Sequence, residues 1–167
     1  MRRHTIIDSP VGPLTAVADD EALIAIYFER HGRAPAVTEH GERTDDHPVL
    51  AAARDQLADY FAGRRTGFDL PLAPRGDAFQ QRVWAQLREI PYGQTRSYGQ
   101  LARALGQPGA AQAVGNANGA NPLSIVVPCH RVIGSDGSLT GYAGGLERKR
   151  WLLAHEEPAA ASSGRLF

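Results

Sequence analysis

The pattern of apolar residues changes once along this chain, at the proline-containing stretch 70–74, and this change limits the fold more than any other feature. Before it, short runs alternate as β-strands do; after it, apolar residues recur at the three- and four-residue spacing of amphipathic helices. Two prolines in five residues favour extended backbone and cannot continue a helix. We therefore predict an α+β fold with two domains, residues 1–73 and residues 74–158.

The N-terminal part predicts a small antiparallel sheet and one helix. Strand-like runs at 5–8, 14–18 and 22–28 are separated by turn residues. Apolar residues at helical spacing predict a helix over 48–61 that Gly63 ends. The polar segment 30–46 is expected to be a loop. Because no catalytic cluster is visible in this part, we expect it to be a scaffold.

Three histidines of the N-terminal part, His31, His40 and His47, lie in or beside this polar segment. Histidine is a common metal ligand, but a structural zinc site usually needs further ligands such as cysteine thiolates. We therefore expect all three to be surface residues and no metal to be bound there.

The C-terminal part predicts a helix-turn-helix. Asp77 is a candidate N-cap for a helix that reaches Ile90, and Ser97 can cap a second helix over 98–105. Glycines and a proline at 106–109 then break the chain before a third helix at 110–118. That helix is rich in alanine and glycine, so its backbone can approach either a DNA groove or a neighbouring element closely. Composition alone leaves both interpretations open.

Charge is unevenly distributed although the whole chain is neutral. Residues 1–73 hold eight Lys and Arg against twelve Asp and Glu, whereas residues 74–167 hold ten against six. The polarity favours a polyanionic partner for the C-terminal part. No window approaches the roughly 18 apolar residues of a membrane span, and the N-terminus does not resemble a secretory leader. We expect a cytoplasmic protein.

Cys129 is the only cysteine in the chain. It therefore cannot form an internal disulfide or supply the several thiolates of a zinc site, which leaves packing or reactivity as its role. A free cysteine is often simply a buried small hydrophobe. Here His130 and Arg131 follow it directly, and cationic neighbours stabilise the nucleophilic thiolate. This neighbourhood favours a reactive thiol.

Several motifs around this thiol resemble one protein family. They are the run 128–132, Asn121 eight residues before the cysteine, and the segment 142–146, within a similarity that extends from about residue 79 to residue 156. Together they resemble the O6-alkylguanine-DNA alkyltransferases, also called methylated-DNA–protein-cysteine methyltransferases. The N-terminal half resembles the family only in layout, which is ribonuclease H-like. The resemblance implies a winged-helix-like C-terminal domain.

The resemblance implies a suicide repair protein that moves an alkyl group from the exocyclic oxygen of guanine in double-stranded DNA onto its own cysteine. O4-alkylthymine is a second candidate substrate. By motif position Cys129 is the acceptor, His130 its base through a bound water, and Glu156 the residue that orients the histidine. Asn121 braces the turn beside the site, and Tyr98 donates a hydrogen bond to the purine and crowds the phosphate of the lesion.

The expected contacts with substrate and DNA lie around these residues. The substrate pocket is expected to include Val132, Tyr142, Ala143 and Arg131. The expected DNA contacts are Arg96, Ser97, Ala110, Ala111, Gln112, Gly115, Asn118 and Ser135.

The chemistry of the residues agrees with this interpretation. Displacement at an alkyl carbon bound to oxygen needs a soft, deprotonated nucleophile and a hydrogen bond for the departing oxygen, which a thiolate and a phenol supply. A Cys-His-Glu relay has the logic of a catalytic triad. A stacked guanine cannot reach a recessed thiol, so the base is expected to flip out of the duplex.

Gln112 is a departure from the family pattern. Seventeen residues before the cysteine, relatives usually carry an arginine that fills the gap left by the flipped base. Glutamine lacks the charge and the stacking face of guanidinium, so we expect weaker DNA binding and slower transfer. Family members that bind zinc in the N-terminal domain use cysteines there; this chain has none there, and we expect neither metal nor cofactor.

Two other functions remain open. An alkyltransferase-like protein would bind lesions without transfer, but such proteins replace the cysteine that is present here. A thiol hydrolase could use Cys129, His130 and Glu156, but no oxyanion hole is evident, and adjacent side chains in an extended segment point apart. We expect a monomer that can cluster cooperatively on DNA through its oppositely charged halves, with a mobile tail at 159–167.

Overall fold

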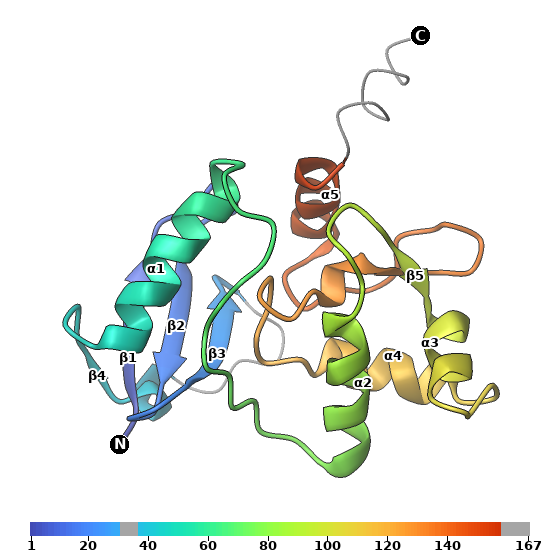
Figure 1. The fold of residues 1–167 in the computed structure, drawn as a ribbon, viewed down its shortest axis with the longest axis horizontal. Coiled ribbons are helices and arrows are strands. Elements are labelled where there is room, and N and C mark those ends of the chain that lie inside the picture. Colours follow the sequence, from blue (N-terminus) through green and yellow to red (C-terminus); the bar gives the residue numbers. More distant parts are fainter. Residues whose placement is uncertain (31–36, 158–167) are drawn as a thin grey trace, which may run out of the picture.

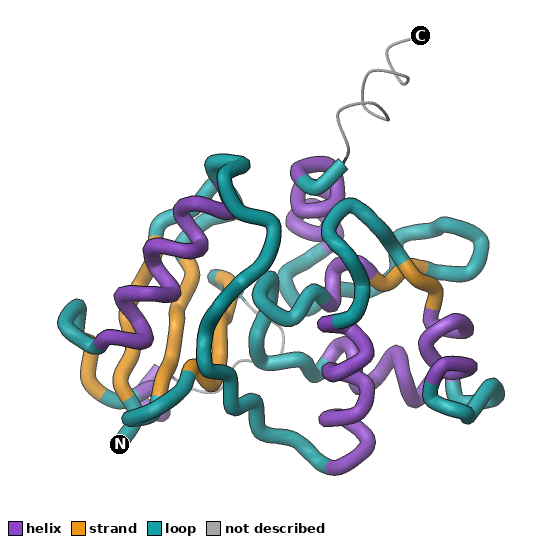
Figure 2. The backbone as a smooth tube through the Cα atoms, viewed as in Figure 1, coloured by secondary structure: helices purple, strands orange, loops and turns teal. Residues whose placement is uncertain are grey.

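The computed structural model describes residues 1–30 and 37–157, and the predicted α+β fold is confirmed. A four-stranded sheet with one helix forms the N-terminal part, and a mostly helical part with a two-stranded sheet lies beside it (Figure 1). Figure 2 shows the long loops of the C-terminal part between its short helices. Residue His31 and the predicted tail 159–167 lie outside the described residues.

The N-terminal sheet contains the predicted antiparallel meander. Strand β1 (Arg3–Ile7) pairs with β2 (Leu14–Ala18), and β2 pairs with β3 (Leu23–Phe28). A fourth strand, β4 (Glu42–Arg43), adds to β1 in parallel, so the order is β3-β2-β1-β4. The turn between β1 and β2 contains Gly12 at φ 96°, a backbone conformation that glycine adopts without strain.

The predicted loop 30–46 is wrong where the 3-10 helix η1 (Val37–His40) and strand β4 form. His40, expected at the surface, is only 4% exposed, because its ring stacks on Tyr27 with 5.5 Å between centroids. His47 has a structural role: its Nδ1 accepts a hydrogen bond from Val49 N and caps the following helix. A neutral imidazole can serve as such a cap because one ring nitrogen is an acceptor.

Helix α1 (Pro48–Phe61) covers one face of the sheet and confirms the predicted helix. Its buried residues Leu50, Ala53, Leu57 and Tyr60 repeat at helical spacing and belong to the same core as the inward-facing strand residues. Gly63 follows the helix at φ 79°, as expected of a residue that ends it.

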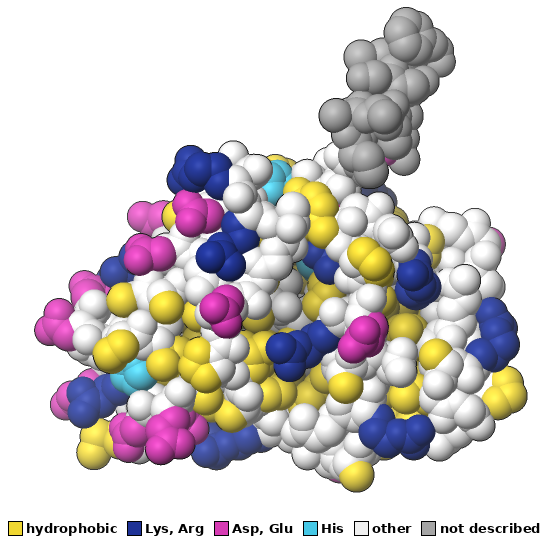
Figure 3. All heavy atoms as spheres, viewed as in Figure 1, with side chains coloured by type: hydrophobic (Ala, Val, Ile, Leu, Met, Phe, Trp, Pro, Cys, Tyr) yellow, Lys and Arg dark blue, Asp and Glu magenta, His cyan; other side chains and the backbone are white. Residues whose placement is uncertain are grey.

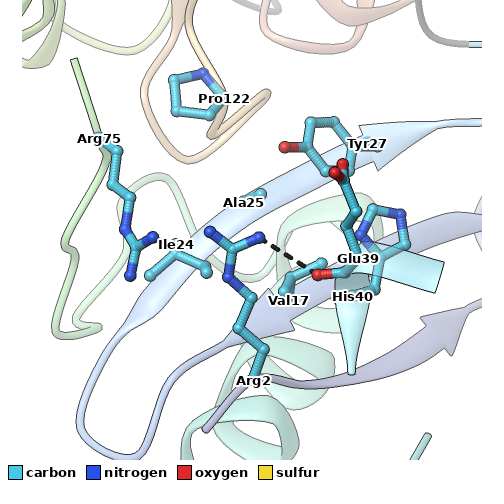
Figure 4. Close-up of a pocket in the computed structure, with 9 residues that line it drawn as sticks. All are labelled: Arg2, Val17, Ile24, Ala25, Tyr27, Glu39, His40, Arg75 and Pro122. Atoms are coloured by element: carbon cyan, nitrogen blue, oxygen red, sulfur yellow. Dashed lines mark hydrogen bonds between the residues drawn. The ribbon is translucent and has the colours of Figure 1, made fainter. Parts of the chain in front are cut away.

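The opposite face of the sheet carries a small separate apolar cluster of Val17, Ile24 and Ala25. Side chains of successive strand residues alternate between faces, which is why Val17 lies away from α1. A hollow of about 390 Å³ opens here, and Figure 4 shows the guanidinium groups of Arg2 and Arg75 pointing into it. In the described part of the chain, none of the predicted site residues lines this hollow.

Backbone hydrogen bonds join the two halves. The predicted linker pairs in parallel with the start of β3, since Leu23 N donates to Pro71 O (2.8 Å) and Ala73 N donates to Leu23 O (2.9 Å). Further along β3, Ile26 N donates to Pro122 O at 2.8 Å. The C-terminal part is therefore fixed to the sheet close to the segment that leads to Cys129.

The C-terminal part begins with α2 (Ala78–Arg88), which Asp77 caps as predicted through a capping box with Gln80. Strand β5 (Arg96–Ser97) follows, and Ser97 caps α3 (Tyr98–Ala104) in the same way with Gln100. Each box satisfies N–H groups that a helix start leaves without partners. Helix α4 (Ala111–Gly119) packs on α2 and α3, so the predicted helix-turn-helix is confirmed.

Helix α4 has one buried and one exposed side. Val114, Ala117 and Asn118 are buried, while Gln112 and Asn116 are exposed. Trp84 of α2 fixes the helix by donating from Nε1 to Ala117 O at 2.9 Å. Close internal packing is therefore confirmed on one side of the helix, while its approach to a DNA groove stays a prediction for the exposed polar side.

The last described elements are the turn η2 (Cys129–Arg131), strand β6 (Val132–Ile133), which pairs in parallel with β5, and helix α5 (Leu146–His155). The apolar pattern did not predict α5, because a buried lysine, Lys149, occupies its inner face beside Leu152. Among residues 1–30 and 37–157, no helix has the length and apolar character needed to cross a membrane.

Candidate active site

Cys129 lies at the start of a tight turn and is 4% exposed. The preceding backbone folds on itself: Val127 N donates to Leu123 O (2.9 Å) and Cys129 N donates to Val127 O (2.8 Å). Ile125 has φ 74°, a strained conformation for a β-branched residue that the surrounding packing must hold. The assumption of an extended segment around Cys129 is wrong, so it no longer argues against a hydrolase.

Two buried asparagines hold this turn. Asn121 donates from Nδ2 to Val127 O (2.8 Å) and accepts from Leu123 N (3.0 Å). Asn118 donates from Nδ2 to Cys129 O at 3.3 Å. Asn118 was expected to contact DNA; that expectation is wrong in this structure, because the side chain is 3% exposed and directed at the cysteine backbone.

His130 and Glu156 form a buried pair. His130 Nε2 lies 2.8 Å from Glu156 Oε2, and both side chains are nearly inaccessible to solvent. Burial lowers the pKa of His130, although Glu156 opposes this, so the ring is neutral near pH 7. Burial alone would raise the pKa of Glu156, but hydrogen bonds from His130 and Arg131 outweigh it and hold this pKa at about 2.

The ionised carboxylate fixes the tautomer of His130. A carboxylate only accepts hydrogen bonds, so Nε2 must carry the proton and Nδ1 must be the basic nitrogen. Nδ1 is buried and makes no hydrogen bond to any residue that the structure describes. The ring thus keeps a basic nitrogen available inside the protein.

Arg131 is placed differently from the prediction. Its Nε and Nη2 donate to the two oxygens of Glu156 (2.7 and 3.0 Å), and its Nη1 donates to Ile90 O (2.7 Å). With the side chain 6% exposed and its Nε, Nη1 and Nη2 each hydrogen bonded inside the protein, Arg131 is directed away from any substrate, so its expected place in the substrate pocket is wrong. Its role is to hold Glu156 ionised.

Lys149, which no sequence motif indicated, is the cation with the largest effect on the pKa of the Cys129 thiol. It is fully buried on α5, and Nζ donates to Thr140 O at 3.3 Å. Burial lowers the pKa of Lys149 to about 8. Burial also raises the pKa of the Cys129 thiol, and Asn121, Lys149 and Tyr142 oppose that rise. The predicted influence of His130 and Arg131 on the thiol is replaced by that of Lys149.

The other predicted pocket residues are buried or half-buried, and one of them acts on the thiol. Val132 is fully buried, Ala143 is half-buried, and the Tyr142 hydroxyl is buried close enough to Cys129 that the thiol and the phenol affect each other's pKa. The Tyr98 hydroxyl is hydrogen bonded to Thr140 Oγ1. Thr140 therefore connects Tyr98, through its side chain, with Lys149, through its carbonyl.

An open groove of about 630 Å³ lies at the helix-turn-helix. Of the predicted DNA contacts it is lined by Ala111, Gln112, Gly115 and Ser135, together with Tyr98. Ala110 precedes α4, and Ser97 and Arg96 lie in β5, where Arg96 donates to Thr95 O at 2.8 Å. On the face in Figure 3, acidic side chains lie mostly over the N-terminal part and basic ones predominate over the C-terminal part.

The described residues contain no group of three or more His, Cys, Asp or Glu side chains arranged to hold a metal ion.

Two family models match the chain. Residues 2–74 match the 6-O-methylguanine DNA methyltransferase, ribonuclease-like domain, and residues 78–158 match the DNA binding domain of the same name. A curated methylated-DNA–protein-cysteine methyltransferase of Mycobacterium tuberculosis is 50% identical over 167 residues, which is 100% of this chain and 99% of that protein. One from Salmonella typhimurium is 52% identical over 158 residues, 90% of this chain and 92% of that protein.

A solved structure with the same fold is that of Mycobacterium tuberculosis OGT in complex with DNA. It has a TM-score of 0.85 and 51% sequence identity to this chain, and the match covers 92% of each chain.

The influence of Lys149 on the thiol gives a direct prediction. Lys149→Met keeps the length of the side chain and removes the charge, so the pKa of Cys129 should rise and its reaction with iodoacetamide at pH 7.5 should slow by about tenfold. Folding should be retained, because removing a buried charge spares its desolvation. The measurement is the rate of carbamidomethylation by intact mass.

Arg150→Met is the matched control, because Arg150 is an exposed cation on the same helix. Equal rates for Lys149→Met and the wild-type protein across pH 6 to 10 would exclude the assigned role of Lys149.

Proposed function

Because this chain belongs to the methylated-DNA–protein-cysteine methyltransferase family, we propose that Cys129 is the residue at which its reaction occurs. The protein is a DNA-binding methyltransferase that repairs DNA by direct reversal. The observation that carries the assignment of the site is the buried pair of His130 and Glu156 directly beside the single thiol.

The proposed reaction is a single displacement. The sulfur of Cys129 forms a bond to the alkyl carbon of O6-alkylguanine, and the bond from that carbon to O6 breaks with its electron pair moving to the guanine. The thiol proton passes to His130 Nδ1 through one water, and the departing guanine takes up a proton from solvent, to which His130 then gives up its own. The product is a stable thioether, so each molecule reacts once.

The electrostatics of the free protein support a base-assisted step. Because burial raises the pKa of Cys129, the thiol is mostly protonated near neutral pH and needs a base. His130 is neutral with Nδ1 unoccupied by the described residues, so it can accept that proton. Glu156 then stabilises the imidazolium, and Lys149 stabilises the thiolate.

The groove at the helix-turn-helix is the proposed site for duplex DNA carrying an alkylated guanine. The first N–H groups of α4 have no side-chain cap at Ala110, so they can donate to a backbone phosphate. We infer that Gln112 enters the space left by the flipped guanine. Tyr98 must then exchange its hydrogen bond to Thr140 for one to the purine.

The two alternatives are less well supported. Lesion binding without transfer would not require a buried histidine–carboxylate pair next to a thiol. Hydrolysis would need N–H groups directed at an oxyanion beside Cys129, whereas Cys129 N is bound to Val127 O at 2.8 Å.

Intact mass spectrometry tests the proposed site. After incubation with a short duplex that carries one O6-methylguanine, the wild-type protein should gain one methyl group, about 14 Da, in proportion to the lesion, because the thioether is not hydrolysed. Cys129→Ser should gain none. Tight lesion binding by the wild-type protein without an adduct would make this a recognition protein; repeated turnover would make it a hydrolase.

Gln112→Arg should raise affinity for DNA and speed methyl transfer, because guanidinium adds charge, donors and a stacking surface in the groove. We expect a gain of about three- to tenfold at moderate salt, measured by fluorescence anisotropy and by single-turnover transfer. Ala113→Arg adds the same charge at an exposed neighbour outside the groove. Equal gains from both variants, or none from Gln112→Arg, would contradict the role of position 112.

We also infer that the protein is a monomer in solution and clusters on longer DNA, because its acidic N-terminal part can meet the basic C-terminal part of a neighbour. Sedimentation should give a monomer without DNA. Binding to a duplex of several site lengths should be cooperative at low salt and lose that cooperativity as salt rises. Non-cooperative isotherms at low salt would count against clustering.

A further inference from the structure

The N-terminal part contributes one side chain to the buried relay. Tyr60, on the last turn of α1, donates its hydroxyl to Glu156 Oε2 at 2.6 Å. Glu156 is the C-cap of α5, 96 residues further along the chain. The accepting atom is the same carboxylate oxygen that faces His130 Nε2 at 2.8 Å. The part of the chain expected to be only a scaffold therefore touches the group that orients the base.

Packing fixes the position of this hydroxyl. The fully buried ring of Tyr60 makes edge contacts with Phe61, Tyr92 and His155, at centroid distances of 5.2, 6.3 and 5.0 Å. His155 also binds the backbone, with Nε2 2.8 Å from Tyr60 O. Burial, and then the charge of Glu156, raise the pKa of Tyr60 far above its ordinary value. The phenol therefore stays protonated and acts as a donor.

The carboxylate of Glu156 accepts four hydrogen bonds from the described residues. Oε1 accepts from Arg131 Nε, and Oε2 accepts from Arg131 Nη2, His130 Nε2 and Tyr60 Oη. Three donors share Oε2, so Arg131 Nη2 and Tyr60 Oη both compete with His130 for its electron density. A carboxylate that accepts more hydrogen bonds is a weaker base, and it draws less on the proton of the histidine.

We propose that Tyr60 is a positioning residue of the active site. Its hydroxyl holds Oε2 of Glu156 against His130 and weakens the attraction of that carboxylate for the Nε2 proton of His130. This inference rests on the proposed function, since it assigns His130 the task of taking the thiol proton. It also gives the N-terminal part a chemical role in addition to its structural one.

The expected effect of losing the hydroxyl follows from charge stabilisation. Without Tyr60 Oη, the ionised form of Glu156 is less stabilised, the carboxylate becomes more basic, and imidazolium at His130 is favoured. The other titratable and charged groups near the pair stay in place. Arg131 on η2 and Lys149 on α5 are cations, whereas Tyr92 after α2 and Tyr142 before α5 have raised pKa values and stay neutral. The pKa of His130 should therefore rise. As the pH falls, the neutral form needed for transfer should be lost at a higher pH than in the wild-type protein.

Tyr60→Phe keeps the ring and removes only the donor. The pH profile of single-turnover methyl transfer should move its acid limb upward by about half a unit to one unit, so that the rate on that limb falls by about three- to tenfold. At alkaline pH the rate should approach that of the wild-type protein. An NMR titration of the His130 ring nitrogens should show the same upward shift in DNA-free protein.

Tyr92→Phe is the matched control. Tyr92 belongs to the same aromatic cluster, and its hydroxyl donates to a backbone carbonyl, His155 O, at 3.3 Å instead of to Glu156. Its pH profile and the His130 titration should coincide with those of the wild-type protein.

Three results would overturn the inference. One is a Tyr60→Phe profile that coincides with wild type; another is an equal fall in rate at every pH in both variants, which marks lost packing. The third is an unchanged His130 titration. The titration needs neither DNA nor transfer, so failure of the proposed function, seen as a wild-type protein that gains no methyl group, is distinguished from failure of the role of Tyr60.

Discussion

The ion pair between Glu156 and Arg131 is buried, and the arrangement around Cys129 depends on it. Arg131 follows the thiol by two residues and Glu156 ends α5, so this pair fixes the reactive turn to the last helix. Breaking one partner of a buried pair typically costs about 3–5 kcal/mol, because the other charge is left desolvated. The same contact keeps the carboxylate ionised, which in turn fixes the tautomer of His130. One interaction therefore serves both folding and chemistry.

The join between the halves surrounds this centre. Tyr60 reaches Glu156 from α1, Ile26 binds Pro122 just before the reactive turn, and Arg148 on α5 donates to Val11 O and Glu29 O at 2.9 and 2.7 Å. Each contact crosses from the N-terminal part to a segment that carries or adjoins a site residue. Because a base and a thiol must keep their relative positions within a fraction of an ångström, such bracing explains why an N-terminal part without its own reactive cluster accompanies the site.

Local signals predicted what depends on local sequence. The N-caps at Asp77 and Ser97 and the end of α1 at Gly63 depend on residue types close in the sequence, and they were predicted correctly. The resemblance also brought Cys129, His130 and Glu156 together, although their spacing of 27 residues along the chain carries no geometric information by itself. Missed features depend on tertiary contact. Arg131 was assigned to the substrate pocket because it lies close to the thiol in the sequence. Nothing in the sequence shows that its guanidinium binds the carboxylate of Glu156, 25 residues later.

Lys149 and Tyr60 were missed for the same reason, and both bear on how a buried thiol can react. Burial makes Cys129 a weaker acid, which protects it from modification between encounters with DNA but also removes the nucleophile. A cation placed outside the relay, at Lys149, favours the thiolate without consuming the basic nitrogen of His130. Tyr60 acts at the other end of the relay, on the carboxylate of Glu156. The two residues thus divide control of one proton: Lys149 eases its departure from sulfur, and Tyr60 limits how firmly the histidine retains it.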